Sequence, residues 1–222
     1  NYYWGSSPYL TLTVNSTDGD LMNMSYSLWS VIGHANTVYN NLKNATASQA
    51  MKNQCMGECL AWKAMAYFFL VRSFGDVPII HDNSAMLADG SYSNVSRVKK
   101  ADVYEYIILT LEKAMQLLPR NGSPGRIDYY SAEGLLAKVY LSKSGVNANG
   151  NGQRNVEDLT KAAAYAKDVI ENSGRTLMTN YADVFRLQNA MNKEMLFAWM
   201  WTADTSIWTV QNTLQSDLAM VG

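Results

Sequence analysis

The segment that most constrains the fold runs from Cys59 to Phe74, where apolar or aromatic side chains occupy most positions. A helix of this composition is buried on most of its circumference, so other elements must surround it. Directly after it, Gly75 can adopt the left-handed conformation that caps a helix, and Pro78 cannot continue one. The sequence therefore predicts a central buried helix that ends at a sharp corner.

Apolar residues at three- and four-residue steps predict further helices on both sides of this one. The expected helices span residues 21–42, 49–74 with Ser48 as N-cap, 102–118, 130–143 and 156–171, and a short one spans 181–187. Residues 81–100 and 144–156 read as polar connectors, with a short extended piece from Val77 to His81. The run from Asn192 to Trp201 predicts a strand entered after a loop.

The order of these helices and the alanines at their expected contact positions favour antiparallel hairpins of the tetratricopeptide-like kind. Successive pairs are too unevenly spaced for a strict repeat of about 34 residues. We therefore expect an all-α fold of tetratricopeptide-like antiparallel helical hairpins, with irregular loops and a short strand near the C-terminal end. The patterns place Tyr26 and Ile170 on inward faces and assign Trp29, Trp62 and Trp199 to the core.

The composition excludes several classes of partner. The 222 residues include 18 basic and 19 acidic side chains without strong clustering, which argues against a nucleic-acid groove or a polybasic membrane patch. No run of about 18 apolar residues is present to span a bilayer. Six Trp and fourteen Tyr accompany only 17% charged residues. This balance is typical of an extracellular protein that handles polar, uncharged ligands.

Few residues offer catalytic or metal-binding chemistry. Cys55 and Cys59 share a helical face with Cβ vectors pointing the same way, so we expect two small buried hydrophobes rather than a disulfide. His34 has no acidic or nucleophilic partner at a useful spacing, and His81 follows an extended piece. No Gly-x-Ser-x-Gly, His-Glu-x-x-His or phosphate-loop motif occurs. We expect no enzyme activity, no cofactor and no metal.

The loop-like N-terminal segment carries the residues expected to bind ligand. Trp and Tyr rings stack on the C–H faces of sugars, and Asn and Asp side chains bond the hydroxyls. The predicted ligand-binding residues are Tyr2, Tyr3, Trp4, Tyr9, Asn15 and Asp18, with Trp201 and Trp208 as second candidates. The alternative is that these rings pack onto the helical body. For Asp18 with Asp20, a glycosidase carboxylate pair and a calcium-binding turn stay open beside the favoured solvated turn.

Four sequence blocks occur in a specific order. They are Gly57-Glu58 with the buried helix and the Phe74–Pro78 corner; Leu111–Ala114 with Leu117–Pro119, Gly125-Arg126 and Leu135–Leu141; Ala163–Ile170; and Glu194–Phe197. Together, over about residues 21–199, they resemble the SusD/RagB family of surface nutrient-binding lipoproteins of Bacteroidota. Lys63 stands where the family usually has Arg, which loses a planar fork of donors.

The blocks themselves are expected to be structural. Gly75 and Pro78 shape the corner, and Asp76 is placed to hydrogen-bond turn backbone. Arg126 is expected to tie this corner to the next hairpin through a carboxylate or carbonyl contact. The resemblance therefore identifies a family through its architecture, without marking the ligand site.

The resemblance implies non-catalytic capture of oligosaccharide at the external face of the outer membrane and delivery to a SusC-like TonB-dependent transporter. The alternatives are a peptide-binding family member and a helical-repeat scaffold that binds only protein; an enzyme ranks third. Residues 1–222 are expected to form one SusD-like helical domain, a fragment of a longer lipid-anchored protein. Within it, residues 1–20 form an irregular aromatic loop, 21–187 the helical body and 188–222 the start of a loop-rich part.

Overall fold

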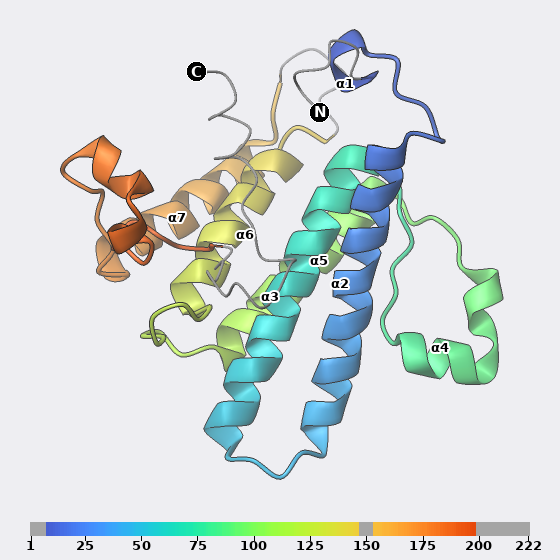
Figure 1. Ribbon diagram of the computed structural model, residues 1–222, viewed down its shortest axis with the longest axis horizontal. Coiled ribbons are helices and arrows are strands. Elements are labelled where there is room, and N and C mark those ends of the chain that lie inside the picture. The colour runs from blue at the N-terminus through green and yellow to red at the C-terminus, as the bar shows by residue number, and fades with distance from the viewer. Residues whose placement is uncertain (1–7, 147–152, 199–222) are drawn as a thin grey trace.

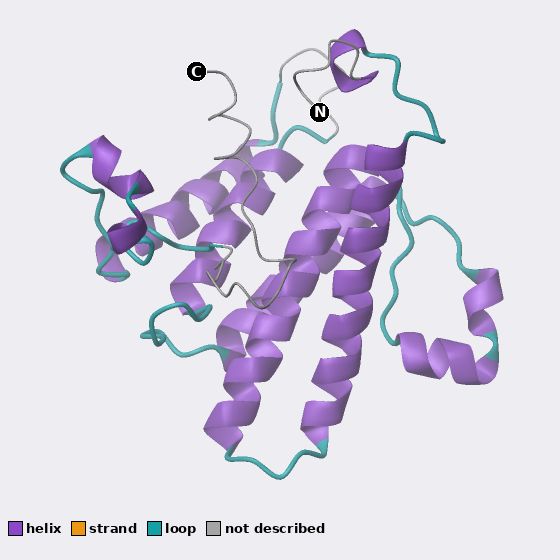
Figure 2. Cartoon of the chain, viewed as in Figure 1, coloured by secondary structure: helices purple, strands orange, loops and turns teal. Residues whose placement is uncertain are grey.

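The computed structural model describes residues 8–146 and 153–198, and the regular elements of this part are helices (Figures 1 and 2). The α-helices are α1 (Pro8–Thr11), α2 (Gly19–Lys43), α3 (Gln49–Phe74), α4 (Asn83–Asp89), α5 (Lys100–Leu117), α6 (Tyr129–Lys143) and α7 (Val156–Asn172). The 3₁₀ segments are η1 (Ser91–Asn94), η2 (Tyr181–Phe185) and η3 (Leu187–Asn189), the last two in place of the short helix predicted over residues 181–187. The predicted all-α class is confirmed.

The long helices pack in chain order, α2 on α3, α3 on α5, α5 on α6 and α6 on α7. Figure 1 shows them running in alternating directions, as antiparallel hairpins require. At one end of the bundle, here called the α1 end, α2, α5 and α7 begin and α3 and α6 finish. The short helix α1 lies nearest to this end. The described residues next to these helix ends therefore lie at one surface.

Helix α3 is the centre of the layer, with α2 on one side and α5 on the other. Ala61, Leu70 and Tyr67 have no exposed surface, so the prediction of a central buried helix is confirmed. The Tyr67 hydroxyl accepts the Ile80 backbone N–H at 2.8 Å, which satisfies the polar tip of an otherwise buried ring. Trp29, assigned to the core from the sequence, packs edge-on against Tyr67 with ring centres 6.1 Å apart.

Both predicted ends of α3 are confirmed by their capping geometry. The Ser48 side chain accepts the Met51 N–H at 3.3 Å, as an N-cap does for an otherwise unpaired donor. At the other end, Gly75 has a φ of 71° and its N–H donates to the Val71 carbonyl at 3.1 Å. A side chain at this positive φ would be strained, which explains the glycine.

The connector over residues 81–100 is more ordered than its polar composition predicts, because it contains α4 and η1. Asp82 caps the start of α4, and Gly90 ends it with a φ of 76°. Helix α4 buries none of its residues, so it lacks the apolar periodicity from which a helix is predicted. The two ends of the connector meet where the Val98 N–H donates to the Val77 carbonyl at 3.1 Å. Of the extended piece expected from Val77 to His81, only Val77 forms a bridge, with Val98.

The strand expected over residues 192–201 is wrong for its described part, 192–198, which forms turns. The Asn192 side-chain oxygen accepts the Glu194 N–H at 2.9 Å, and its carbonyl accepts the Met195 N–H at 3.2 Å. These bonds close the backbone on itself. The described part also offers no neighbouring strand for pairing, and an extended segment needs one to satisfy its backbone groups.

Two residues placed on inward faces are exposed instead. Tyr26 on α2 is 65% exposed and Ile170 on α7 is 75% exposed. Helices α2 and α7 lie at the two edges of the layer, where each packs mainly against one neighbour. The buried stripe of an edge helix is narrower than the apolar stripe of its sequence, so its outer apolar residues stay in solvent.

Candidate functional site

The structure places only part of the predicted ligand-binding set. Tyr2, Tyr3, Trp4, Trp201 and Trp208 lie outside the described residues, as does the side chain of Tyr9, whose backbone belongs to α1. Asn15 and Asp18 are described, and both lie in the segment between α1 and α2. The described part of the prediction, Asn15 and Asp18, therefore falls at the α1 end of the bundle.

Asn15 and Asp18 both have local structural partners. Asn15 Oδ1 accepts the N–H and the hydroxyl of Thr17 at 2.9 and 2.6 Å. Asp18 Oδ1 accepts the Leu21 N–H at 2.9 Å and so caps α2. Asp20 lies in the first turn of the same helix, where the helix dipole favours negative charge. These contacts agree with the interpretation of Asp18 and Asp20 as part of a turn. They do not involve Asn15 Nδ2 or Asp18 Oδ2.

The same end of the bundle carries a polar hollow of about 510 Å³ between the start of α5, the end of α6 and the start of α7. Its lining residues are Ala101, Asp102, Glu105, Lys143, Ser144, Val146, Gln153, Arg154, Asn155 and Asp158. Charged and amide groups in this mixture can both donate to and accept from sugar hydroxyls. Sequence reasoning missed this hollow because residues 144–156 read only as a connector. The available signal was Lys143 in the last turn before it and Asp158 in the first turn after it.

Lys143 organises the charges of this hollow. Its Nζ lies 2.8 Å from Asp158 Oδ1 and 3.2 Å from Glu105 Oε1. Burial lowers the pKa of Lys143, but the hydrogen bonds to both carboxylates outweigh burial and the pKa is raised overall. Arg154 adds a bond from Nη1 to the Leu141 carbonyl at 3.1 Å. The floor of the hollow is thus held by paired charges that link three helices.

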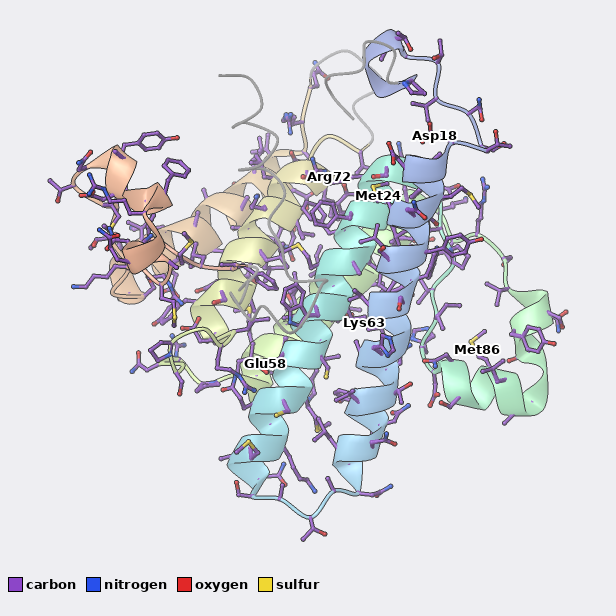
Figure 3. The ribbon with its side chains drawn as sticks, in the orientation of Figure 1. Asp18, Met24, Glu58, Lys63, Arg72 and Met86 are labelled. Atoms are coloured by element: carbon purple, nitrogen blue, oxygen red, sulfur yellow. The ribbon has the colours of Figure 1, made fainter. Side chains whose placement is uncertain are left out.

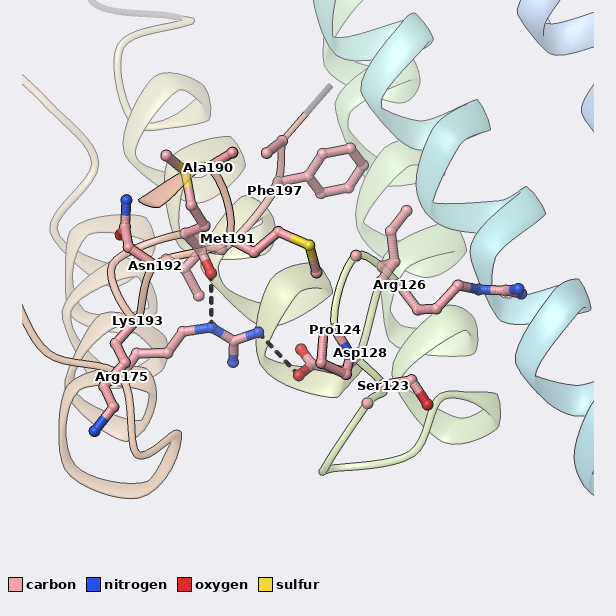
Figure 4. A pocket seen from close by; sticks show the side chains of 16 residues that line it. Ser123, Pro124, Arg126, Asp128, Arg175, Ala190, Met191, Asn192, Lys193 and Phe197 are labelled. Carbon is pink, nitrogen blue, oxygen red and sulfur yellow. Dashed lines mark hydrogen bonds and ion pairs between the residues drawn. The ribbon is translucent and has the colours of Figure 1, made fainter. Parts of the chain in front are cut away.

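A second hollow, of about 220 Å³, lies between the 122–128 loop and residues 190–198 (Figure 4). Arg175 spans it, since its Nε donates to the Met195 carbonyl and its Nη2 to Asp128 Oδ2, both at 2.9 Å. The other carboxylate oxygen of Asp128 caps α6 by accepting the Ser131 N–H at 2.9 Å. The polar groups here are engaged with one another, so this region is a structural joint.

Arg126 makes a carboxylate contact, the kind that the sequence predicted, but not at the Gly75 corner. Its Nε and Nη2 bond Glu58 Oε1 and Oε2 at 2.7 and 2.6 Å, a carboxylate contact of bidentate geometry. Glu58 lies in the first half of α3, far along the helix from the Gly75 corner, so the expected tie to that corner is wrong. The corner is joined to α5 by Asp76, whose Oδ1 accepts the Lys100 N–H at 2.7 Å. The prediction that Asp76 bonds backbone is therefore confirmed.

The two cysteines are free, half-buried thiols. Burial raises the pKa of Cys59 to about 11, with the neighbouring Cys55 and Glu58 contributing in the same direction. A thiol with such a pKa is almost entirely protonated at neutral pH and is a poor nucleophile. Packing, rather than reactivity, therefore accounts for Cys59.

The fold and its polar hollows define a class of protein: a tetratricopeptide-like helical domain whose α1 end presents hydrogen-bonding groups. Comparison with known sequences identifies the family. Residues 2–141 match the SusD-like family described as starch-binding associating with outer membrane, and the chain belongs to this family. A SusD-like protein from Bacteroides ovatus is 39% identical over 219 residues, which cover 97% of this chain and 39% of that protein.

Solved structures agree with this assignment. A crystal structure with xylogluco-oligosaccharide is 36% identical, with a TM-score of 0.85, and covers 97% of this chain and 42% of that one. A laminarin-binding SusD-like protein is 26% identical, with a TM-score of 0.61 over 75% of this chain and 34% of that one. The chain thus spans about two fifths of the length of the Bacteroides ovatus relative.

Proposed function

We propose that this chain takes part in the non-catalytic capture of an oligosaccharide and in its delivery to a TonB-dependent transporter. The observation that carries the proposal is the similarity to the crystal structure with xylogluco-oligosaccharide, at 36% identity across almost the whole chain. At this identity the backbone of the matched part, 42% of that chain, is expected to be shared. A xyloglucan-type oligosaccharide is therefore the first ligand to test.

The ligand-binding surface in this proposal is the α1 end with the N-terminal aromatic residues. Tyr2, Tyr3 and Trp4 would supply flat faces for stacking, at little cost in side-chain entropy. Asn15 and Asp18 would offer the polar atoms that their turn contacts leave unused. The polar hollow beside Lys143 extends the same surface with donors and acceptors.

The location at the external face of the outer membrane is likewise a proposal. It is supported by the family description, which associates starch-binding members with that membrane. None of the helices in the described ranges combines the length and apolar character that crossing a bilayer requires. A lipid anchor in the full-length protein and a SusC-like transporter beneath it complete the proposed arrangement.

The test is affinity electrophoresis of the full-length protein that contains this chain, through gels cast with xyloglucan, laminarin, starch or an acidic polysaccharide. We expect retention by one neutral polymer, with no rise in reducing ends during incubation. Released reducing sugar would establish an enzyme and overturn the proposal. Retention by none of the polymers would favour peptide capture or a scaffold that binds only protein.

Trp4→Ala tests the proposed surface. Loss of one stacking ring is expected to weaken binding of the retained polymer about tenfold. Tyr181→Ala is the matched control, because this ring on η2 is 76% exposed and is not part of the proposed surface. Equal affinity of the Trp4 variant and the wild type would show that this ring packs on the body instead of binding ligand.

A further inference from the structure

Lys63 is a buried cation with no carboxylate bonded to it among the described residues. It lies on α3 where this helix faces α2 (Figure 3), and only 6% of it is exposed. Its Nζ donates to Asn36 Oδ1 at 2.6 Å and lies 5.4 Å from the centre of the Tyr106 ring. No ion pair among the described residues includes Lys63. An ammonium carries three donors, and a buried charge is costly without a bonded partner, so the fold leaves Lys63 without a direct counter-ion.

Lys63 lines a hollow of about 240 Å³ between α2, α3 and residues 81–82. The other lining residues are Ala35, Asn36, Tyr39, Asn40, Lys43, Cys59, Leu60, His81 and Asp82. This volume is below the ~300–1,000 Å³ of pockets for drug-sized ligands. The hollow is therefore suited to a small ligand, about the size of a short organic acid or one sugar ring.

The one carboxylate of this hollow is already engaged elsewhere. Asp82 Oδ1 accepts the Ser84 and Ala85 N–H groups at 3.0 and 3.1 Å, at the start of α4. Asp82 Oδ2 accepts the Asn40 amide at 2.7 Å. Among the described residues no hydrogen bond or ion pair joins Asp82 to Lys63, whose Nζ bonds the Asn36 amide oxygen instead.

The titration of the neighbouring groups agrees with a net positive hollow. Burial lowers the pKa of Lys63 to about 8, with the Asp82 charge opposing this effect, so the amine is largely charged at neutral pH. The pKa of His81 is lowered by burial and then by the positive charge of Lys63. Lys43, whose Nζ donates to Asn40 Oδ1 at 2.8 Å, adds a second cation at the rim.

We propose that the hollow between α2, α3 and residues 81–82 binds the carboxylate of a small ligand, with the Lys63 ammonium as its counter-ion. A carboxylate bonded to an ammonium forms a charge-assisted pair that satisfies donors the fold leaves over. The chemistry has two sources, a free short-chain organic acid and the carboxylate of an acidic monosaccharide. This site is separate from the surface proposed for polysaccharide capture.

The test is a calorimetric titration of the full-length protein with sodium acetate, D-galacturonate and neutral D-galactose. We expect at least one carboxylate to bind and galactose not to bind. Binding of both carboxylates would identify a general carboxylate site, and binding of galacturonate alone would identify an acidic-sugar site. No binding of either carboxylate would overturn the proposal.

Lys63→Met is the decisive variant, with Lys138→Met as its control, because Lys138 is an exposed lysine on α6. Loss of the charge-assisted pair is expected to weaken carboxylate binding by tenfold or more in the first variant and to leave it unchanged in the second. Equal binding by wild type and Lys63→Met would overturn the assignment of the counter-ion.

Two measurements separate this inference from folding and from glycan capture. If Lys63→Met does not fold, NMR of the wild type replaces it: the lysine signal with the lowered pKa must shift with the carboxylate and not with galactose. Polysaccharide retention is measured on the same variants and is expected to be unchanged. Failure of the carboxylate site would therefore leave the proposed glycan capture untouched, and the reverse also holds.

Discussion

Gly57 in α3 is the position where adding a single methyl group is expected to damage the bundle. A Cβ at this residue would lie 2.6 Å from Leu118 Cγ, 2.8 Å from Leu118 Cδ2 and 3.3 Å from the Ala114 carbonyl oxygen. Leu118 is only 6% exposed, so its side chain has little room to turn away. The close approach of α3 to the end of α5 therefore depends on the absence of a side chain at residue 57.

Two opposing effects set the change in the free energy of unfolding that Gly57→Ala causes. Alanine is favoured over glycine in a helix interior by about 1 kcal/mol. Overpacking a dense core costs about 1–3 kcal/mol, and the upper part of this range applies because the methyl group meets backbone as well as a side chain. We expect a net destabilisation on the order of 1–2 kcal/mol. Gly33→Ala on α2 is the matched control, because nothing lies within 4 Å of its added Cβ.

The assay is thermal and urea unfolding of both variants beside the wild type. For a chain of this length, 1 kcal/mol corresponds to a change in Tm of about 2–4 °C. Gly57→Ala should therefore lower Tm by a few degrees, and Gly33→Ala should raise it. The reasoning is refuted if both alanines stabilise the protein equally, since α3 and α5 would then be further apart at residue 57 than the structure shows.

Three further changes test other contacts. Glu133 is 2% exposed with Oε2 unpartnered, and its pKa is raised to about 7 by burial and then by Asp168. Between about pH 4.5 and 7 the folded protein then binds more protons than the unfolded chain, so wild-type stability falls as pH rises through this window. Glu133→Gln has no carboxyl to titrate, so its stability should not fall over this window, and above pH 7 it should exceed that of the wild type by on the order of 1–3 kcal/mol. If urea unfolding gives the same dependence of stability on pH for both proteins, the raised pKa of Glu133 is contradicted. Arg175→Met leaves Asp128 Oδ2 without its partner and should cost about 1–3 kcal/mol; it should also speed proteolysis near residues 190–198, and an unchanged cleavage rate would count against the joint. Ser48→Ala removes the N-cap of α3 and should cost about 1 kcal/mol in the same unfolding assay, whereas no change would show that water replaces the cap.

The long helices and their caps were predictable because their signals are local. Ser48 and Gly75 are recognisable at α3 from side-chain chemistry alone, since one supplies an acceptor and the other a permitted positive φ. Over residues 192–198, the described part of the strand expected from Asn192 to Trp201, the prediction failed for the opposite reason. The apolar sequence of this segment suits a strand, but strand formation requires a partner, and the local bonds to Asn192 make turns instead.

The candidate site was predictable only as far as residue type allowed. Aromatic residues near the N-terminus indicate sugar stacking, and Trp4 stays a prediction that the experiment above tests. The charged hollow at the α1 end could not be predicted, because Glu105, Lys143 and Asp158 come from three helices and meet only when those helices pack. Nothing in the spacing of these residues along the chain indicates that they share a surface.

The sequence by itself determined the class of fold, the ends of the buried helix and the family, because each depends on periodicity, capping chemistry or ordered blocks of residues. Tertiary structure alone decided which charges meet. It paired Arg126 with Glu58 rather than with the Gly75 corner, and it left Lys63 buried with its ammonium bonded to Asn36 instead of to a carboxylate. The physical reason is that electrostatic partners are set by distance and burial in three dimensions, and these follow from how helices remote in sequence pack together.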